Sequence, residues 1–261
     1  MRITFLGTAG AGGVPRYGCD CRACTRARAD LAWQRLPCSA LIEADGQRIL
    51  LDAGLMDLHE RFPAGTLDAI VLTHFHADHV QGLFHLRWGK GARIPVYAPP
   101  DAEGCADLYK HPGLLEFRPL RAFEPFTLGA LRITPLPLNH SKPTFGYAIE
   151  ATSSARFAYL TDTLGLPAQT EAFLAAWQAD GLAIDCSSAP TEIPGNHNDW
   201  SRALASIQCV APRHAWLTHI GHGLDSWLIE QPPELAPDIH IAHDGAIIEI
   251  SAAVRSAPQP C

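Results

Sequence analysis

Four side chains that bind divalent metals fall within six positions of the chain: His74, His76, Asp78 and His79. They directly follow the apolar run 69–72, so we expect a buried strand to deliver the first histidine and a loop to present the others. Imidazole suits zinc, nickel, iron or manganese, and the added carboxylate favours the harder ions. Because a catalytic ion must keep one position open, four ligands exceed what a single ion needs. The pattern therefore indicates two ions side by side.

Three more metal-binding side chains each end an apolar run in the same way. His140 follows residues 136–139, Asp162 follows residues 157–161, and His219 follows residues 215–218. Two ions need about seven protein ligands in addition to water, and these three positions complete that number. An ordinary polar loop is the alternative for any one of these positions, but the repetition at four strand ends favours a metal centre.

A second cluster consists of Cys19, Cys21 and Cys24. Three thiolates at this spacing predict a closed, tetrahedral and therefore structural zinc site. His222 is the best candidate for the fourth ligand and Cys38 competes with it, while three free cysteines in a loop are the alternative. The eight cysteines are unevenly placed, which indicates metal binding in a reducing compartment and not a disulfide framework.

Composition narrows the class of protein. The 261 residues are 47% hydrophobic and 18% charged, as in a soluble globular protein, and carry a formal net charge of −7. An acidic chain without a basic run argues against a nucleic-acid partner, so we expect a small-molecule substrate. No apolar segment reaches the roughly 18 residues of a membrane span, and no apolar stretch typical of a signal peptide follows residues 1–7, so a cytoplasmic location without membrane contact is expected.

Short β-rich runs alternate with helical patterns along the whole chain, with no repeat period. This mixture predicts two sheets packed face to face with helices outside, in one domain spanning residues 1–261. We expect a cysteine-rich zinc loop at about 18–25, a surface insertion in the proline-rich segment 95–143 and a frayed tail at about 252–261. The predicted strands are residues 3–6, 40–44, 48–52, 69–73, 94–98, 131–136, 146–151, 157–161, 182–185, 215–218, 240–242 and 247–250. The predicted helices are residues 22–31, 80–88, 102–109, 168–178, 200–210 and 227–229.

The motif H-x-H-x-D-H, followed by a distant His, Asp and His, resembles the metallo-β-lactamase superfamily. This resemblance implies an α/β fold, the αββα four-layer sandwich, with a two-metal site along one sheet edge. It also implies the ligands of each ion. His74, His76 and His140 would hold the first metal, and Asp78, His79 and His219 the second, with Asp162 bridging them. Asp52, in a strand-end Asp-x-Gly, would orient a ligand histidine.

One branch of that superfamily, the cyclic phosphodiesterases of phosphonate catabolism by the carbon–phosphorus lyase pathway, is resembled by residues 7–8, 13–15, 18–21, 79–84, 86–89, 110–115, 135–142 and 144–147. The resemblance implies hydrolysis of 5-phospho-α-D-ribosyl 1,2-cyclic phosphate to ribose 1,5-bisphosphate. It implies two active-site ions, with Mn²⁺ preferred over Zn²⁺, Ni²⁺ or Fe²⁺, one separate structural Zn²⁺, and a homodimer.

Catalytic roles follow from the same interpretation. Water held between the two ions would attack phosphorus, with Asp78 both ligand and catalytic residue, and His197 would protonate the departing sugar oxygen. Lys142 and Arg16 are the candidates for binding the 5-phosphate. The rival functions are a tRNA 3′-end-processing type of endonuclease, which would need an RNA-gripping arm, and an inactive metal-binding scaffold.

Overall fold

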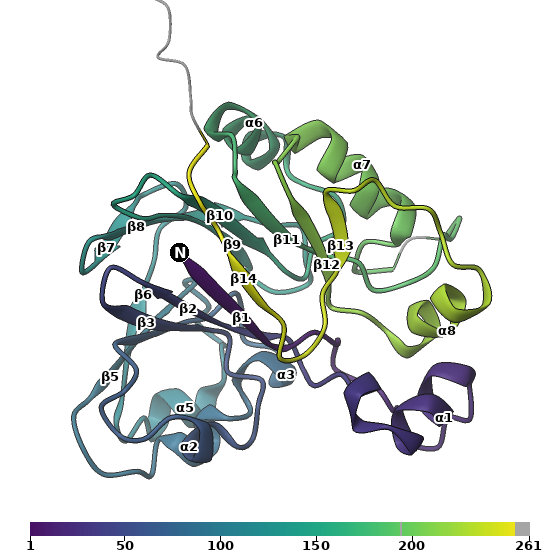
Figure 1. Cartoon of the computed structure of the whole chain (residues 1–261). Helices are drawn as coiled ribbons and strands as arrows, with labels where there is room; N and C mark the ends of the chain where they lie inside the picture. The colour runs from purple at the N-terminus through teal and green to yellow at the C-terminus, as the bar shows by residue number, and fades with distance from the viewer. Residues whose placement is uncertain (194, 254–261) are drawn as a thin grey trace, which may run out of the picture.

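Two seven-stranded sheets lie face to face, with helices on both outer surfaces, in the computed structural model (Figure 1). The structure describes residues 1–193 and 195–253. The layers are helix, sheet, sheet and helix, so the predicted αββα sandwich is confirmed.

The first sheet has the order β14-β1-β2-β3-β4-β5-β6. Its strands from β14 to β3 pair antiparallel, and those from β3 to β6 pair parallel. The carboxyl ends of β3 and β4 therefore point to one edge, where the next residues are Asp52 and the metal-binding motif. The bounds are β1 Arg2–Gly7, β2 Ser39–Ala44, β3 Gln47–Leu51, β4 Ala69–Val71, β5 Ile94–Ala98, β6 Leu115–Pro119 and β14 Ile247–Glu249.

The second sheet repeats this plan, with the order β13-β12-β11-β10-β9-β8-β7. Its strands β7 to β10 pair antiparallel, and β10 to β13 pair parallel. Both sheets thus join an antiparallel half to a parallel half whose strand ends can carry polar residues. The bounds are β7 Phe126–Leu128, β8 Leu131–Pro137, β9 Phe145–Glu150, β10 Arg156–Leu160, β11 Gly181–Asp185, β12 Ala215–Thr218 and β13 Ile239–Ile241.

Helices cover the outer faces of both sheets (Figure 1). Helices α2 to α5 enclose an apolar cluster against the first sheet, and α6 to α8 enclose another against the second. Helix α1, which contains Cys24 of the cysteine cluster, packs on α8. The bounds are α1 Arg22–Ala29, α2 Leu58–Arg61, α3 Ala77–Val80, α4 Leu83–Leu86, α5 Ala106–Lys110, α6 Ala168–Trp177, α7 Trp200–Val210 and α8 His222–Glu230, with a 3₁₀ turn at Leu31–Trp33.

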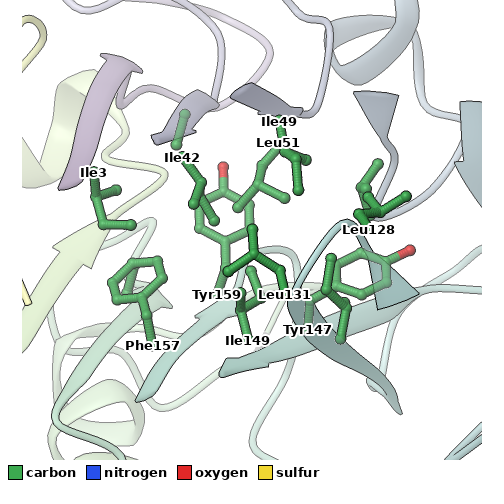
Figure 2. Close-up of a cluster of buried hydrophobic side chains, with 14 of the residues drawn as sticks. Ile3, Ile42, Ile49, Leu51, Leu128, Leu131, Tyr147, Ile149, Phe157 and Tyr159 are labelled. Atoms are coloured by element: carbon green, nitrogen blue, oxygen red, sulfur yellow. The ribbon is translucent and has the colours of Figure 1, made fainter. Parts of the chain in front are cut away.

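The core between the sheets consists of side chains at alternate strand positions, because successive residues of a strand point to opposite faces. Ile42 and Ile49 of the first sheet and Ile149 and Phe157 of the second are fully buried there (Figure 2). The Tyr147 hydroxyl in this layer donates a hydrogen bond to the Leu72 carbonyl oxygen, two residues before His74. The apolar layer therefore holds the two sheets together beside the strand that leads to the metal-binding motif.

The segment 95–143 is not a surface insertion, so this prediction is wrong. It contains β5 and β6 of the first sheet and β7 and β8 of the second, and Leu115, Leu131 and Ile133 are buried. Strands β6 and β7 were not predicted at all. Both lie at sheet edges, where a strand pairs on one side only and Pro119, which has no N–H to donate, is tolerated.

The predicted helix 80–88 is two short helices, α3 and α4, with Gln81 and Gly82 between them. Gly82 lies against the Leu55 carbonyl oxygen, where a Cβ atom would be 2.1 Å from that oxygen. The glycine therefore allows α3 to pack closely on the loop after β3.

Residues 254–261 of the predicted frayed tail lie outside the described residues. Within the described part, the backbone N–H of Ala253 donates to Asp180 at 2.9 Å. Among the helices of the described residues, none has the length and apolar character that crossing a membrane requires.

Candidate metal centre

Three of the predicted residues adopt a left-handed backbone within two residues of the end of a strand. The φ angles are +56° at Asp52, +64° at Asp162 and +61° at His219. Non-glycine residues rarely adopt this conformation, and where they do it often accompanies a functional site. Here the three residues follow β3, β10 and β12, so the chain turns where each strand ends and the side chains gather at one edge of the sandwich.

The first predicted ligand group comes together from both sheets. One possible ligand atom from each of His74, His76, His140 and Asp162 lies within 4.8 Å of the others. His76 Nδ1 is 2.8 Å from His74 Nε2 and 3.0 Å from His140 Nε2. Three imidazole nitrogens that converge in this way offer their lone pairs to one point, as a metal ion requires.

The second predicted group, Asp78, His79 and His219, also has its ligand atoms within 4.8 Å of one another. Asp78 and His79 lie in helix α3, and not in the loop that the sequence predicted. Asp162 joins the two groups, since its Oδ1 is 3.2 Å from His79 Nε2 and its Oδ2 is 3.3 Å from His219 Nε2 and 3.7 Å from His74 Nε2. This position between the groups fits a bridging carboxylate.

Buried polar atoms without a hydrogen-bond partner test whether the residues fit metal ions. His79 Nε2, His219 Nε2 and Asp162 Oδ1 are all buried and lack such a partner, although the first and the last are 3.2 Å apart. Buried polar atoms are nearly always paired, so these atoms need a ligand that the protein does not supply. The donor set of imidazole and carboxylate fits two divalent ions, and accepts Mn²⁺, Zn²⁺, Ni²⁺ or Fe²⁺.

Asp52 holds His79 in position from the first sheet. Its fully buried carboxylate lies 2.9 Å from His79 Nδ1 and accepts hydrogen bonds from the backbone N–H and the hydroxyl of Thr73. The contact fixes Nδ1 as the donor and leaves Nε2 to face the ligand cluster. Thr73 was not singled out from the sequence, because a threonine inside a strand pattern carries no signal of this role.

In the second sheet, Asp185 orients histidines as Asp52 does in the first, and it was not predicted from the sequence. Its carboxylate accepts from His197 Nδ1 at 2.8 Å, from the Ser187 hydroxyl at 2.7 Å and from the Thr163 backbone at 2.9 Å. Ser187 in turn lies 2.7 Å from His219 Nδ1, so one carboxylate orients two histidines. The signal was available, since Asp185 ends an apolar strand like the predicted ligands do.

Contacts with Asp162 and His219 place His197 beside the predicted bridge. Its Nδ1 is 3.9 Å from Asp162 Oδ2, and its ring stacks on that of His219 with centroids 4.6 Å apart. His197, His219 and Asp162 also form a possible ligand group of their own. Because Nδ1 already donates to Asp185, Nε2 is the atom that remains for proton transfer or for a metal.

The predicted cysteine site also comes together. Cys19, Cys21, Cys24 and His222 form one group, with His222 Nδ1 at 3.4 Å from Cys19 Sγ and 3.5 Å from Cys21 Sγ. Burial raises the pKa of Cys21, but hydrogen bonds with Ser226 and His222 outweigh burial and lower it to about 6. The donor set fits a tetrahedral zinc ion. The rival fourth ligand, Cys38, is buried elsewhere and contacts the Thr218 hydroxyl, so it does not belong to this site.

The two candidates for phosphate binding differ in their surroundings. Lys142 is 3.5 Å from the buried carboxylate of Asp101. Arg16 lines a cavity together with His197, His219 and His222. Only Arg16 therefore shares a cavity with histidines of both predicted metal sites.

Charge around Asp162 controls the protonation of the metal-free site. Burial lowers the pKa of His219, but the Asp162 carboxylate and a hydrogen bond to Asp78 outweigh burial and raise it to about 9. Burial likewise opposes protonation of His79, yet Asp162 and Asp52 hold its pKa well above the usual range. By contrast, burial keeps the pKa of His74 well below it. Without metal, the carboxylates are thus neutralised by protonated histidines.

The fold and the two ligand groups define a protein of the metallo-β-lactamase type. The chain belongs to the beta-lactamase superfamily, whose domain profile matches residues 47–220.

Several individual proteins are similar to this chain in sequence or in structure. An octanoyltransferase of Porphyromonas gingivalis is 32% identical over 269 residues, covering 95% of this chain and 52% of that protein, so the chain spans about half the length of this relative. The solved structure of a diphosphatase from the PhnP family has a TM-score of 0.79 and 29% identity, covering 95% of this chain and 97% of that one. Zn²⁺-bound PqqB from Methylobacterium extorquens, 22% identical with a TM-score of 0.74 over 95% and 100% of the two chains, shares the fold.

Replacing Asp162 tests the bridge. We expect Asp162→Ala to reduce the active-site metal content from two ions to at most one and to lower kcat/KM by more than about 100-fold, since even outer partners of metal ligands cost 10- to 100-fold. Elemental analysis and phosphodiesterase assays measure the two effects. Asp57→Ala, which removes only a surface ion pair with Arg61, is the control and should retain both ions. Full metal content in Asp162→Ala would rule out the bridging role.

The raised pKa of His219 predicts a pH dependence of metal uptake. Metal ligands must be deprotonated, so below about pH 9 an incoming ion has to displace the proton of His219. We therefore expect proton release on metal binding, and an affinity that rises from about pH 7 to about pH 9. Calorimetric titrations of the metal-free protein in buffers of different ionisation enthalpy measure both. An affinity that is constant over this range would contradict the protonation state described above.

Proposed function

We propose that this protein is a dinuclear-metal cyclic phosphodiesterase, acting on 5-phospho-α-D-ribosyl 1,2-cyclic phosphate to give ribose 1,5-bisphosphate in phosphonate catabolism. The observation that carries the proposal is an imidazole held beside a two-metal ligand set, with His197 Nδ1 at 2.8 Å from Asp185 and 3.9 Å from Asp162. A proton donor next to two metal positions suits a reaction in which an oxygen leaves phosphorus.

Two bound ions would supply an activated water and neutralise charge on the phosphoryl oxygens. The protein's residues would hold the ions and supply the proton. His74, His76 and His140 would hold one ion, Asp78, His79 and His219 would hold the other, and Asp162 would be shared between them. Asp185 accepts a hydrogen bond from His197 Nδ1, so in the imidazolium form of His197 the proton on Nε2 is the one available to the departing sugar oxygen.

Metal identities and assembly are part of the same proposal. We propose Mn²⁺ at the active site, with Zn²⁺, Ni²⁺ and Fe²⁺ as alternatives, and Zn²⁺ at the cysteine site, in a cytoplasmic homodimer. The mixed imidazole and carboxylate ligands support a harder ion at the first site, and the thiolates support zinc at the second. Elemental analysis of the purified protein distinguishes these alternatives.

A second candidate function is hydrolysis of a diphosphate bond. It is favoured by the structural similarity to a diphosphatase of the PhnP family, at 29% identity over 95% of this chain. The same site would serve, because both reactions displace an oxygen from phosphorus. The difference is the leaving group, which is a phosphate in one case and a sugar alkoxide in the other.

Phosphorus NMR of the products tests the two candidates. We expect the cyclic phosphate to open so that phosphate stays on the 1-oxygen of the sugar, and ADP-ribose, as a diphosphate probe, to react at least about 100-fold more slowly, because the proposed site is built for an alkoxide leaving group. Faster cleavage of ADP-ribose would favour the diphosphatase. Cleavage of precursor tRNA at a comparable rate would favour the endonuclease, and no hydrolysis of any of these by the metal-loaded protein would favour a scaffold.

Replacing His197 tests its role as general acid. We expect His197→Ala to slow substrates with alkoxide leaving groups by about 100- to 10,000-fold, and p-nitrophenyl phosphodiesters, whose leaving group needs no proton, by less than about 10-fold. Elemental analysis of the same variant should still find two active-site ions. Loss of one ion would instead make His197 a metal ligand, and equal losses on both substrates would remove the general-acid role.

A further inference from the structure

A cavity of about 330 Å³ connects the predicted active site with the predicted zinc site. One part of its wall is formed by His197, His219 and Ser187, and another by Arg16 and His222. A molecule that reacts at the metal-binding histidines can therefore extend towards the cysteine loop. The reaction described above assigns no part of the substrate to this second part of the cavity.

Glycines form part of the cavity wall. Residues 10–13 run along its wall, and a Cβ atom on Gly10 would lie 2.8 Å from the His219 ring. A Cβ atom on Gly12 would meet the aliphatic part of Arg16 at 3.9 Å. The absence of a side chain at Gly10 thus lets the backbone of the loop lie against the ring of His219, a predicted metal ligand.

Arg16 carries a positive charge that no carboxylate neutralises within residues 1–193 and 195–253. Its Nη1 instead lies 3.2 Å from His222 Nε2, while His222 Nδ1 faces the thiols. Lys142, the other candidate cation, already has a partner in Asp101. Of these two cations, Arg16 has the charge left over for an anionic ligand.

The contact between Arg16 and His222 depends on which ring nitrogen carries the proton. A guanidinium can only donate, so in the present geometry Nε2 must accept. An ion held by the cysteines would take the lone pair of Nδ1, and the neutral imidazole would then carry its proton on Nε2. Two donors would face each other, and both would need an acceptor from the cavity.

We infer that Arg16 and the Nε2–H of His222 form a subsite for a second phosphate group of the substrate, and that an ion at the cysteine cluster prepares it. The substrate class is a phosphodiester with a phosphate monoester on its far end, and the inference rests on the proposed function. The oxygens of a phosphate monoester accept hydrogen bonds from both donors and neutralise the guanidinium. The cysteine site thereby affects substrate choice as well as folding.

The experiment compares ribosyl 1,2-cyclic phosphate with and without its 5-phosphate. In the wild-type holoenzyme kcat/KM should favour the phosphorylated form, and Arg16→Gln should reduce this preference by about 10- to 100-fold, mostly through KM, because a charge-assisted hydrogen bond is lost. Arg22→Gln makes the same charge change six residues further along, at the start of helix α1. Its side chain is exposed and pairs with Glu230, so the preference should stay the same.

Nitrogen NMR of His222 provides a readout that does not depend on turnover. In protein loaded with zinc, Nδ1 should be unprotonated and Nε2 protonated, and addition of ribose 5-phosphate should shift the Nε2–H signal. Arg16→Gln should weaken the concentration dependence of that shift by the same factor.

Each failure has a distinct meaning. An unchanged preference in Arg16→Gln, or a His222 signal that ribose 5-phosphate does not move, overturns the subsite while leaving the phosphodiesterase assignment intact. If the wild type hydrolyses neither cyclic phosphate, the proposed function fails, and the NMR titration still decides whether Arg16 and His222 bind the phosphate group.

Discussion

The buried carboxylate of Asp162 is the group on which the rest of the site depends. Its side chain is 2% exposed, and a carboxylate removed from water is costly unless cations or donors surround it. His79 and His219 supply that surrounding charge at 3.2 and 3.3 Å in the metal-free protein. Metal ions would replace the protons, so the same geometry serves both states.

Both sheets position this cluster by the same local arrangement. Asp52, after β3, accepts a hydrogen bond from the backbone N–H of Thr73 and contacts His79. Asp185 at the end of β11 accepts the backbone N–H of Thr163 and contacts His197. A buried carboxylate that is held by a backbone N–H cannot rotate freely, so each histidine ring has a fixed orientation. The apolar layer between the sheets then brings the two halves to one edge (Figure 2).

The amino-terminal loop is tied to the same edge by a buried ion pair. Arg35 donates to both carboxylate oxygens of Asp225 in α8, at 2.8 and 3.1 Å, and to the Ala242 carbonyl oxygen. Breaking one partner of such a pair leaves an uncompensated buried charge, which is strongly destabilising. Helix α8 also carries His222, so this ion pair fastens the amino-terminal segment to the helix that completes the cysteine site. The proposed phosphate subsite lies at this junction.

The sequence by itself determined that metal-binding side chains follow apolar strands, and which ligand types they offer. Apolar runs that end in His74, His140, Asp162 and His219 predicted a metal centre, because burial requires an apolar strand and metal binding requires a polar side chain where it ends. The two-sheet fold followed from the same runs. Edge strands β6 and β7 were missed, since their short, proline-containing segments have weak local patterns and are stabilised by pairing that only the complete sheet provides.

Only the tertiary structure decided which polar residues act together. Asp185 and Ser187 are ordinary in the sequence, and their role appears because β11 lies between β10 and β12 and so presents them to His197 and His219. His222 was the preferred and Cys38 the competing candidate for the fourth zinc ligand, and the packing of α1 on α8 brings the histidine to the cysteines. Distances between residues far apart in the chain depend on sheet order and packing, which residue types and local spacing do not encode.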